Sequence, residues 1–274
     1  MSCGSCHKQQ FAFVDSTLQY STGIDNIAGT RNAMPLFNLG WSTKGFLWDG
    51  GATDLESQVI GPIQNPVEMH ESLPNALSEL NNHPQYPLLF KAAFGTDSIT
   101  IPLVMKAIAQ FERTLISANS KYDLYLRGEA TLTPQETNGL QLYSDMAKGD
   151  CNHCHVLGST FTDFEFRNTG LDSIAVDNGR YLISLNPNDK GKFKTPSLRN
   201  IALTAPYMHD GRFGTLEQVL DFYNTGFHYP SNLDANLQTA VKGRLNPQEM
   251  QDLIAFLNTL TDTEFINNPN HSKP

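Results

Sequence analysis

The chain has 274 residues, of which 39% are hydrophobic and 17% are charged, and its formal net charge is −9. This acidic balance argues against nucleic-acid binding, because phosphate backbones are bound by basic faces. No apolar run approaches the roughly 18 residues that a membrane-spanning helix needs, and no signal peptide is visible. The length fits one large domain or two domains of ordinary size.

In chain order, the first feature is a cysteine motif formed by Cys3, Cys6 and His7. Residues 100–117 come next, and their apolar side chains recur at the spacing of a helix whose first turn contains a proline. The polar residues 119–130 follow. We interpret this segment as the link between two halves of the chain.

The second half opens with residues 133–146, which begin with the capping box Thr-Pro-Gln-Glu and are predicted to be helical. They lead into a second cysteine motif, formed by Cys151, Cys154 and His155. The two motifs use all four cysteines of the chain.

Two further capped helices are predicted over residues 215–223 and 246–260. The tail after Phe265 is predicted to be loosely held. No stretch shows the alternation of a strand, and beyond the two motifs no repeat of fixed period is visible.

Both motifs have the form Cys-x-x-Cys-His, which is typical of covalent attachment of a c-type haem. The two thiols add to the vinyl groups of a haem, and the histidine ligates its iron. The sequence therefore predicts two haems, with His7 and His155 as iron ligands, while His153 is interpreted as a filler residue. Because such attachment happens outside the cytoplasm, we expect a periplasmic protein whose export signal is absent from this sequence.

Two other uses of the cysteines were weighed against haem attachment. A zinc site of four cysteines usually has its two pairs much closer in sequence. Two disulfides would not need a histidine after each pair. Both alternatives are therefore disfavoured.

A further pattern is spread through most of the chain, in seven stretches. They are RNAMPLFN (31–38), FLWDGGATDLESQV (46–59), NPVEM (65–69), AQFERTLIS (109–117), the second cysteine motif, KFKTPSLRN (192–200) and TAPYMHDGRFGTLEQVLDFYNTG (204–226). Together they resemble the bacterial dihaem cytochrome c peroxidase family, which includes the MauG enzymes. The resemblance implies an all-α fold of two cytochrome c-like helical domains, each with one covalently attached haem. Residues 1–125 would hold the peroxidatic haem and residues 126–274 the electron-transfer haem.

The resemblance also implies catalytic residues. Glu68, in NPVEM, matches the carboxylate that acts as base and then acid over the first iron, and Gln58 matches an amide that hydrogen-bonds peroxide. Trp48 matches a tryptophan that relays electrons between the haems. From the residues alone, each of the three would be interpreted as an ordinary polar or aromatic side chain.

At the second haem, the resemblance places a ligand fourteen residues after His209, at Tyr223. Many family members have a methionine there, whereas MauG has a tyrosine. A phenolate stabilises higher oxidation states of iron and lowers its reduction potential. Met208 is a rival ligand, and a tyrosine bonded elsewhere is the remaining alternative. His209 and Asp210 are expected to shape the pocket.

At the first haem, some family members block the resting site with a distal histidine. No histidine lies between His7 and His70, so we expect an open iron that reacts with peroxide while both haems are ferric. His70 lies close enough to Glu68 in sequence to interfere. Three other histidines are interpreted as surface residues: His83, His228 and His271.

Two further roles are implied by the same resemblance. Asn32, Thr204 and Pro206 match positions around a calcium ion between the domains, where calcium would take carbonyl and amide oxygens. Arg199, in PSLRN, is expected to pair with a haem propionate.

Three functions are compatible with these predictions. The leading one is a peroxidase that takes electrons from a monohaem cytochrome c or a cupredoxin and passes them from the C-terminal haem through Trp48 to the N-terminal haem. The second is a MauG-like oxidase that modifies a partner protein through high-valent iron, which Tyr223 favours. The third is a dihaem electron carrier without catalysis, against which Glu68 and Gln58 argue. A homodimer is suggested by the resemblance alone.

Overall fold

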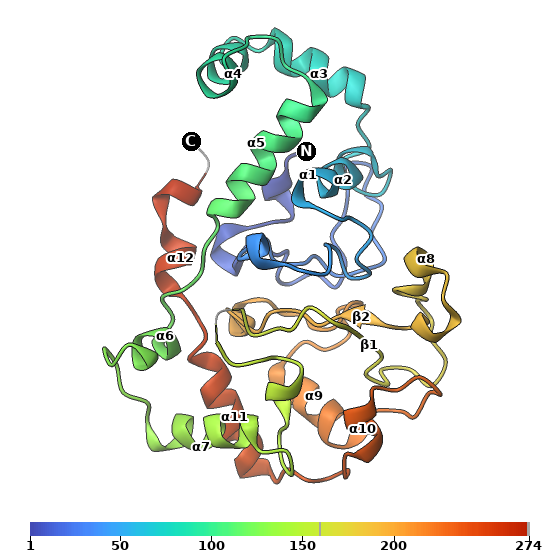
Figure 1. Ribbon diagram of the computed structural model, residues 1–274, viewed down its shortest axis with the longest axis vertical. Helices are drawn as coiled ribbons and strands as arrows, with labels where there is room; N and C mark the ends of the chain where they lie inside the picture. The colour runs from blue at the N-terminus through green and yellow to red at the C-terminus, as the bar shows by residue number, and fades with distance from the viewer. Residues whose placement is uncertain (159, 273–274) are drawn as a thin grey trace.

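The computed structural model describes residues 1–158 and 160–272. The chain forms two predominantly helical halves, the N-terminal half at the top of Figure 1 and the C-terminal half below it. The helices are α1 (Leu55–Gln58), α2 (Ile60–Gln64), α3 (Leu73–Asn82), α4 (Tyr86–Phe94), α5 (Ile101–Thr114), α6 (Lys121–Leu126), α7 (Pro134–Ser144), α8 (Tyr181–Ser184), α9 (Leu216–Asp221), α10 (Ala235–Thr239), α11 (Pro247–Asn258) and α12 (Thr263–Asn267). This confirms the all-α prediction.

The four helices predicted from sequence are present as α5, α7, α9 and α11. Three of them begin with reciprocal capping boxes between side chain and backbone, which satisfy amide groups that have no partner inside the helix. α9 is shorter than predicted because residues Phe222–Gly226 continue it as a π-helical turn. Such turns occur frequently at functional sites.

A short sheet was not predicted from sequence. Strand β1 (Phe166–Arg167) pairs antiparallel with β2 (Phe193–Lys194), with Phe166 opposite Lys194. Strands of two residues are too short to show alternation. Their pairing therefore became visible only in the tertiary structure.

The interpreted link contains a helix that packs on the C-terminal half. Ser120 and Asp123 form a capping box for α6, Tyr122 is buried in the C-terminal core, and Asp123 accepts two hydrogen bonds from Arg199, 2.8 and 2.9 Å long. The boundary predicted after residue 125 falls inside this helix. Six residues are too few for a periodic pattern, so the sequence did not indicate it.

The prediction of a loose tail after Phe265 was wrong. Phe265 is only 3% exposed, and its ring packs against Phe13 at 5.6 Å and Phe37 at 5.8 Å between centroids. The side-chain amide of Gln9 donates to the carbonyl of Asn268. The C-terminal segment thus crosses back and covers the N-terminal half (Figure 1).

His271 lies in this segment, so its interpretation as a surface residue was also wrong. Its ring contacts Phe13 and Phe265, and its Nδ1 atom is buried.

The two halves repeat one backbone framework. Asn38 and Asn200 both adopt left-handed conformations, and their amides donate to Leu115 and Leu260, just beyond α5 and α11. The spacing between matching residues changes along the chain. This explains why no fixed period was visible in the sequence.

A second pair of matching features precedes α1 and α9. An isolated antiparallel bridge joins Phe46 to Ala52 in the N-terminal half, and another joins Tyr207 to Phe213 in the C-terminal half. In each half the helix begins three residues after the bridge. Residues of α1 and α2 can therefore be matched one by one to those of α9 and the π-helical turn.

A buried polar cluster joins the halves where α5 and α11 end. Ser117 exchanges two hydrogen bonds of 2.9 Å with the side chain of Asn38. Its hydroxyl donates to Asp262 and accepts from Asn200. The Asp262 amide donates to the side chain of Asn200. We name these four residues, Asn38, Ser117, Asn200 and Asp262, the junction cluster.

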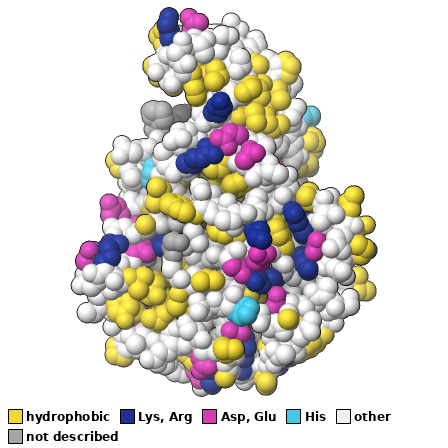
Figure 2. Space-filling model, in the orientation of Figure 1, with side chains coloured by type: hydrophobic (Ala, Val, Ile, Leu, Met, Phe, Trp, Pro, Cys, Tyr) yellow, Lys and Arg dark blue, Asp and Glu magenta, His cyan; other side chains and the backbone are white. Residues whose placement is uncertain are grey.

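Ion pairs reinforce this junction at the surface. Arg31 of the N-terminal half pairs with Asp49 at 2.5 Å and with Asp177 of the C-terminal half at 2.6 Å. Figure 2 shows basic and acidic side chains gathered at mid-height, where the halves meet.

We predict that Asp262→Ala lowers the free energy of unfolding by about 3 kcal/mol, because it leaves the Ser117 hydroxyl and the amides of Ala118 and Asn119 without their acceptor. Thermal unfolding of the holoprotein, followed by circular dichroism, measures the change. Asp97→Ala is the control, since that carboxylate is exposed. Equal midpoints for the two variants would contradict a structural role for the junction cluster.

Candidate functional site: two haem-binding motifs

The two cysteine motifs adopt the same local structure. Each begins with a single 3-10 turn, and in each the histidine amide donates to the first cysteine carbonyl at 2.9 Å, from His7 to Cys3 and from His155 to Cys151. All four cysteines are free thiols. This arrangement brings two thiols and an imidazole into one turn, as covalent haem attachment requires.

Both motif histidines are held through the same ring nitrogen. His7 Nδ1 donates to the Phe13 carbonyl at 2.8 Å, and His155 Nδ1 lies 3.0 Å from the Pro196 carbonyl and 3.3 Å from that of Phe161. Because a carbonyl can only accept, Nδ1 carries the hydrogen and Nε2 keeps its lone pair. That lone pair is the one a haem iron needs, and the hydrogen bond of Nδ1 to the carbonyl fixes the ring orientation.

Burial keeps these imidazoles neutral. It lowers the pKa of His7 and lowers the pKa of His155 to about 4, although hydrogen bonds from the rings to Phe13, Phe161 and Pro196 oppose the shift. Neutral imidazole is the ligating form. Both histidines therefore fit the haem that their motifs predict.

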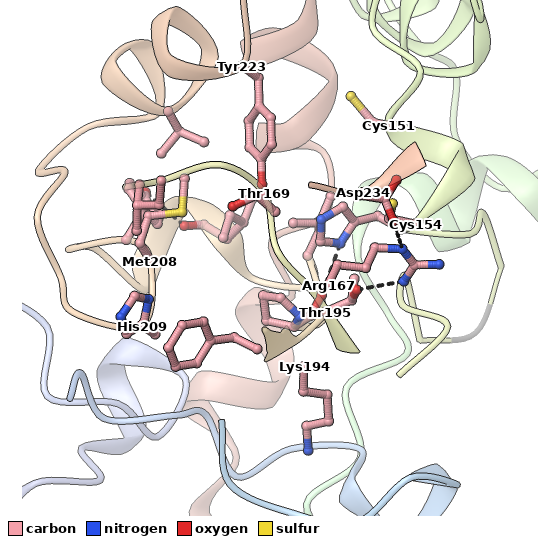
Figure 3. Close-up of a pocket in the computed structure, with 18 of the residues that line it drawn as sticks. Cys151, Cys154, Arg167, Thr169, Lys194, Thr195, Met208, His209, Tyr223 and Asp234 are labelled. Carbon is pink, nitrogen blue, oxygen red and sulfur yellow. Dashed lines mark hydrogen bonds and ion pairs between the residues drawn. The ribbon is translucent and has the colours of Figure 1, made fainter. Parts of the chain in front are cut away.

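The second motif opens onto a cavity of about 250 Å³, which we name the second cavity after this motif. Its wall includes Cys151, Cys154 and His155 on one element, and Tyr223 and Met208 on others. Figure 3 shows the Tyr223 ring descending from its helical segment towards Thr169, with Met208 on a neighbouring loop. The structure thus brings the predicted ligand and its rival to the same cavity.

Tyr223 lies in the π-helical turn, and its ring packs against Phe222. Burial raises the pKa of its phenol, while a hydrogen bond with the Thr169 side chain opposes that rise. A phenol in this environment stays protonated at neutral pH unless it coordinates a Lewis acid such as a ferric iron.

Two cations that the sequence analysis missed also line this cavity. Lys194 is buried, donates to the Gly45 carbonyl at 2.9 Å, and has its pKa lowered to about 8 by burial. Arg167 forms ion pairs with Asp163 and Asp234. Both are suited to neutralise haem propionates. The only available signal was the position of Lys194 within KFKTPSLRN.

Arg199 has a different partner from the one expected. Its guanidinium is buried and makes a bidentate pair with Asp123. The predicted propionate contact stays untested.

The backbone framework that the two halves share, which we call the repeat, indicates which residues form the wall of the first haem site. Counting from the matching bridges places Gln58 and Pro62 where the second half has Val219 and Tyr223, both of which line the second cavity. A proline side chain has no atom that can ligate iron. The first half therefore has no counterpart of the Tyr223 phenol at this position, which the sequence analysis did not consider.

Buried polar atoms without a hydrogen-bond partner lie in the N-terminal half and in the tail that packs on it. Within residues 1–158 and 160–272, the buried side-chain atoms without a hydrogen-bond partner are Ser21 Oγ, Gln58 Oε1, Glu112 Oε2 and His271 Nδ1. Ser21 lies beside the Cys6 thiol. Such orphans mark a place where a polar group is missing, as expected for a haem and its ligands.

Glu68 lies near this motif, since its charge is among those acting on the Cys6 thiol. Its carboxylate accepts a 2.7 Å hydrogen bond from Asn65. His70 does not reach it, because its ring is exposed and bonded to Asp25 at 2.5 Å.

Trp48 lies where the two halves meet. Its indole donates to the Asn32 carbonyl at 2.8 Å, and its own carbonyl accepts from the amide of Lys194. It also lines the second cavity. Its place between the haems stays a prediction.

The three predicted calcium ligands come from both halves of the chain. Asn32, Thr204 and Pro206 all line the second cavity. In the described part of the chain no cluster of three or more His, Cys, Asp or Glu side chains is arranged to hold a metal. A calcium ion here would therefore depend on amide and carbonyl oxygens.

Comparison with known proteins identifies related chains. The family model described as "Di-haem cytochrome c peroxidase" matches residues 1–131. Methylamine utilization protein MauG of Methylorubrum extorquens is 34% identical over 95% of this chain and 72% of that protein. Cytochrome c551 peroxidase of Nitrosomonas europaea is 34% identical over 95% of this chain and 74% of that protein.

A solved structure shares the fold. A MauG-like protein associated with microbial copper homeostasis superposes with a TM-score of 0.91 and 35% identity, covering 100% of this chain and 87% of that one.

Tyr223→Phe removes the phenol oxygen and keeps the ring, so we predict a changed axial ligand at the second haem alone. Low-temperature electron paramagnetic resonance of the ferric protein, which separates the two haems, measures this. Met208→Leu is the matched control and is expected to leave both signals unchanged. A change at the second haem in Met208→Leu, with none in Tyr223→Phe, would make Met208 the ligand.

Proposed function

The chain belongs to the di-haem cytochrome c peroxidase family, and we propose that it reduces hydrogen peroxide to water with electrons from a small redox protein. Membership implies two haem c groups, for which the two motifs are suited. The observation that carries the proposal is Pro62, which matches Tyr223 in the repeated framework and has no atom that can ligate iron. The unpaired amide oxygen of Gln58, four residues earlier, supports it.

Each haem, when bound, supplies an iron that exchanges electrons. The reaction consumes two electrons and two protons for each peroxide and releases two waters. Gln58 would orient the peroxide through its unpaired amide. Glu68 would accept the proton of the near oxygen and return it to the departing one, as a base and then an acid. Its bond to Asn65 holds the carboxylate in place.

Electrons would enter at the second haem and reach the first through Trp48. Support comes from the position of the indole, which is hydrogen-bonded to the N-terminal half and lines the second cavity. The hydrogen bond to Asn32 also fixes the ring orientation.

The donor is proposed to be a monohaem cytochrome c or a cupredoxin. The net charge of −9 favours a basic face on that partner, because complementary charge speeds encounter. None of the helices within residues 1–158 and 160–272 could span a membrane. A periplasmic location is proposed because c-type haems are attached outside the cytoplasm.

A second function is favoured by Tyr223. A phenolate at the second haem would make it a better store of oxidising equivalents, as needed to modify a partner protein. MauG, a relative at 34% identity, is named for methylamine utilization.

Steady-state kinetics separate the two functions. Rapid oxidation of reduced cytochrome c by peroxide, starting from fully ferric enzyme, supports the peroxidase. A long-lived oxidised enzyme without donor oxidation supports the second function.

Glu68→Gln is predicted to lower peroxide turnover by at least a hundredfold, because general acid–base catalysis contributes about 10²–10⁴-fold. Donor oxidation measured by stopped-flow absorbance gives the ratio. Glu71→Gln, three residues along, is the control and should turn over normally. Unchanged turnover in Glu68→Gln would contradict the role of Glu68, and the protein would then be a simple electron carrier or would use a different base.

Calcium binding is proposed at Asn32, Thr204 and Pro206. Atomic emission should find one calcium ion per chain after dialysis, and Asn32→Ala should lower that content. Asn26→Ala, an exposed asparagine in the same half, is the control. The absence of calcium from protein that has not been treated with a chelator would contradict the proposal.

A further inference from the structure

Glu112 occupies a wall position of the first haem site. At the end of α5 the amide of Leu115 donates to the Glu112 carbonyl at 3.1 Å, and at the end of α11 the amide of Leu260 donates to Leu257 at the same distance. The repeat thus matches Glu112 with Leu257, which lines the second cavity. One half has a carboxyl group where the other has a hydrocarbon.

This carboxyl group is buried without a partner. Glu112 is 5% exposed, and its Oε2 has no hydrogen-bond partner in the described part of the chain. The adjacent Arg113 is committed to Glu56 through two hydrogen bonds of 2.8 and 2.9 Å. The positive charge of Arg113 is therefore shared with the carboxylate of Glu56.

The surroundings of Glu112 are mostly uncharged. The groups whose charges bear on it are Arg113 of its own helix, Glu56 of α1, and Cys3 of the first motif, on whose thiol it acts in turn. Burial raises the pKa of Glu112 to about 7, which Arg113 opposes. A carboxyl group that exchanges its proton near neutral pH thus lies at the edge where Cys3 attaches the haem.

We propose that Glu112 takes up a proton when the first haem is reduced and releases it when that haem is oxidised. Reduction adds one electron to the ferric iron, and the Glu112 carboxylate gains one proton from solvent, so the net charge of the site is unchanged. The physical cause is the attraction between the carboxylate and the ferric charge, which weakens on reduction. No bond to substrate is made by Glu112.

The use of this proton rests on the proposed function. Peroxide reduction consumes two protons, and Glu68 returns only the one that it removes. A second carboxyl group in the wall of the same site would keep charge balanced while electrons arrive. Leu257 cannot do this, which fits a second haem that only transfers electrons.

The test is a spectroelectrochemical titration of the first haem at pH values on both sides of 7, without peroxide or donor. A carboxylate favours the ferric state, so the wild-type midpoint potential should fall as the pH rises past the pKa of Glu112. The limiting slope is about 59 mV per pH unit, which corresponds to one proton per electron. Glu112→Gln should remove this slope and raise the potential at high pH.

Two further variants keep the result interpretable. Glu112→Leu reproduces the second half and should behave like Glu112→Gln, and Glu79→Gln removes an exposed charge and should behave like wild type. Absorbance confirms that each variant carries two haems. An unchanged slope in Glu112→Gln, or a flat wild-type profile near pH 7, overturns the proposal. Because no peroxide is used, loss of the slope supports Glu112 even if peroxide turnover proves absent.

Discussion

The junction cluster is the constraint on which the rest of the structure depends. Ser117 is bonded at once to Asn38 of its own half and to Asn200 and Asp262 of the other. These groups are buried, so breaking one bond leaves a polar atom without water or protein partner. The cluster sets where α5 and α11 end, and therefore which of their residues face each haem site.

The two halves show how one framework supports two kinds of chemistry. In both halves a backbone carbonyl accepts a hydrogen bond from Nδ1 of the motif histidine. Equivalent backbone bonds also hold the ends of α5 and α11. Side chains at matching positions then differ. Pro62 of the first half corresponds to Tyr223 of the second, and Glu112 corresponds to Leu257. Under the proposed function, these few differences would separate a reacting haem from an electron-transfer haem.

Contact between the halves has a second consequence, for electron transfer. Trp48 belongs to the N-terminal half, yet it lines the second cavity and its carbonyl is bonded to Lys194 of β2. The pairs that Arg31 makes with Asp49 and Asp177 hold the same region together. These contacts hold Trp48 between the two halves.

The sequence by itself determined the two Cys-x-x-Cys-His motifs and the helices α5, α7, α9 and α11, because these depend on local spacing and capping. It also led to Glu68, Gln58 and Tyr223 through the family resemblance. It did not predict α3 or α4, although both are longer than α9. Nor did it reveal α6, the strand pair, the docking of the tail or the Asp123 partner of Arg199. Those depend on contacts between residues far apart in the chain, for which short segments carry no periodic signal. Only the tertiary structure brought the two halves into register, and that register assigned Pro62 and Glu112 to the first haem site.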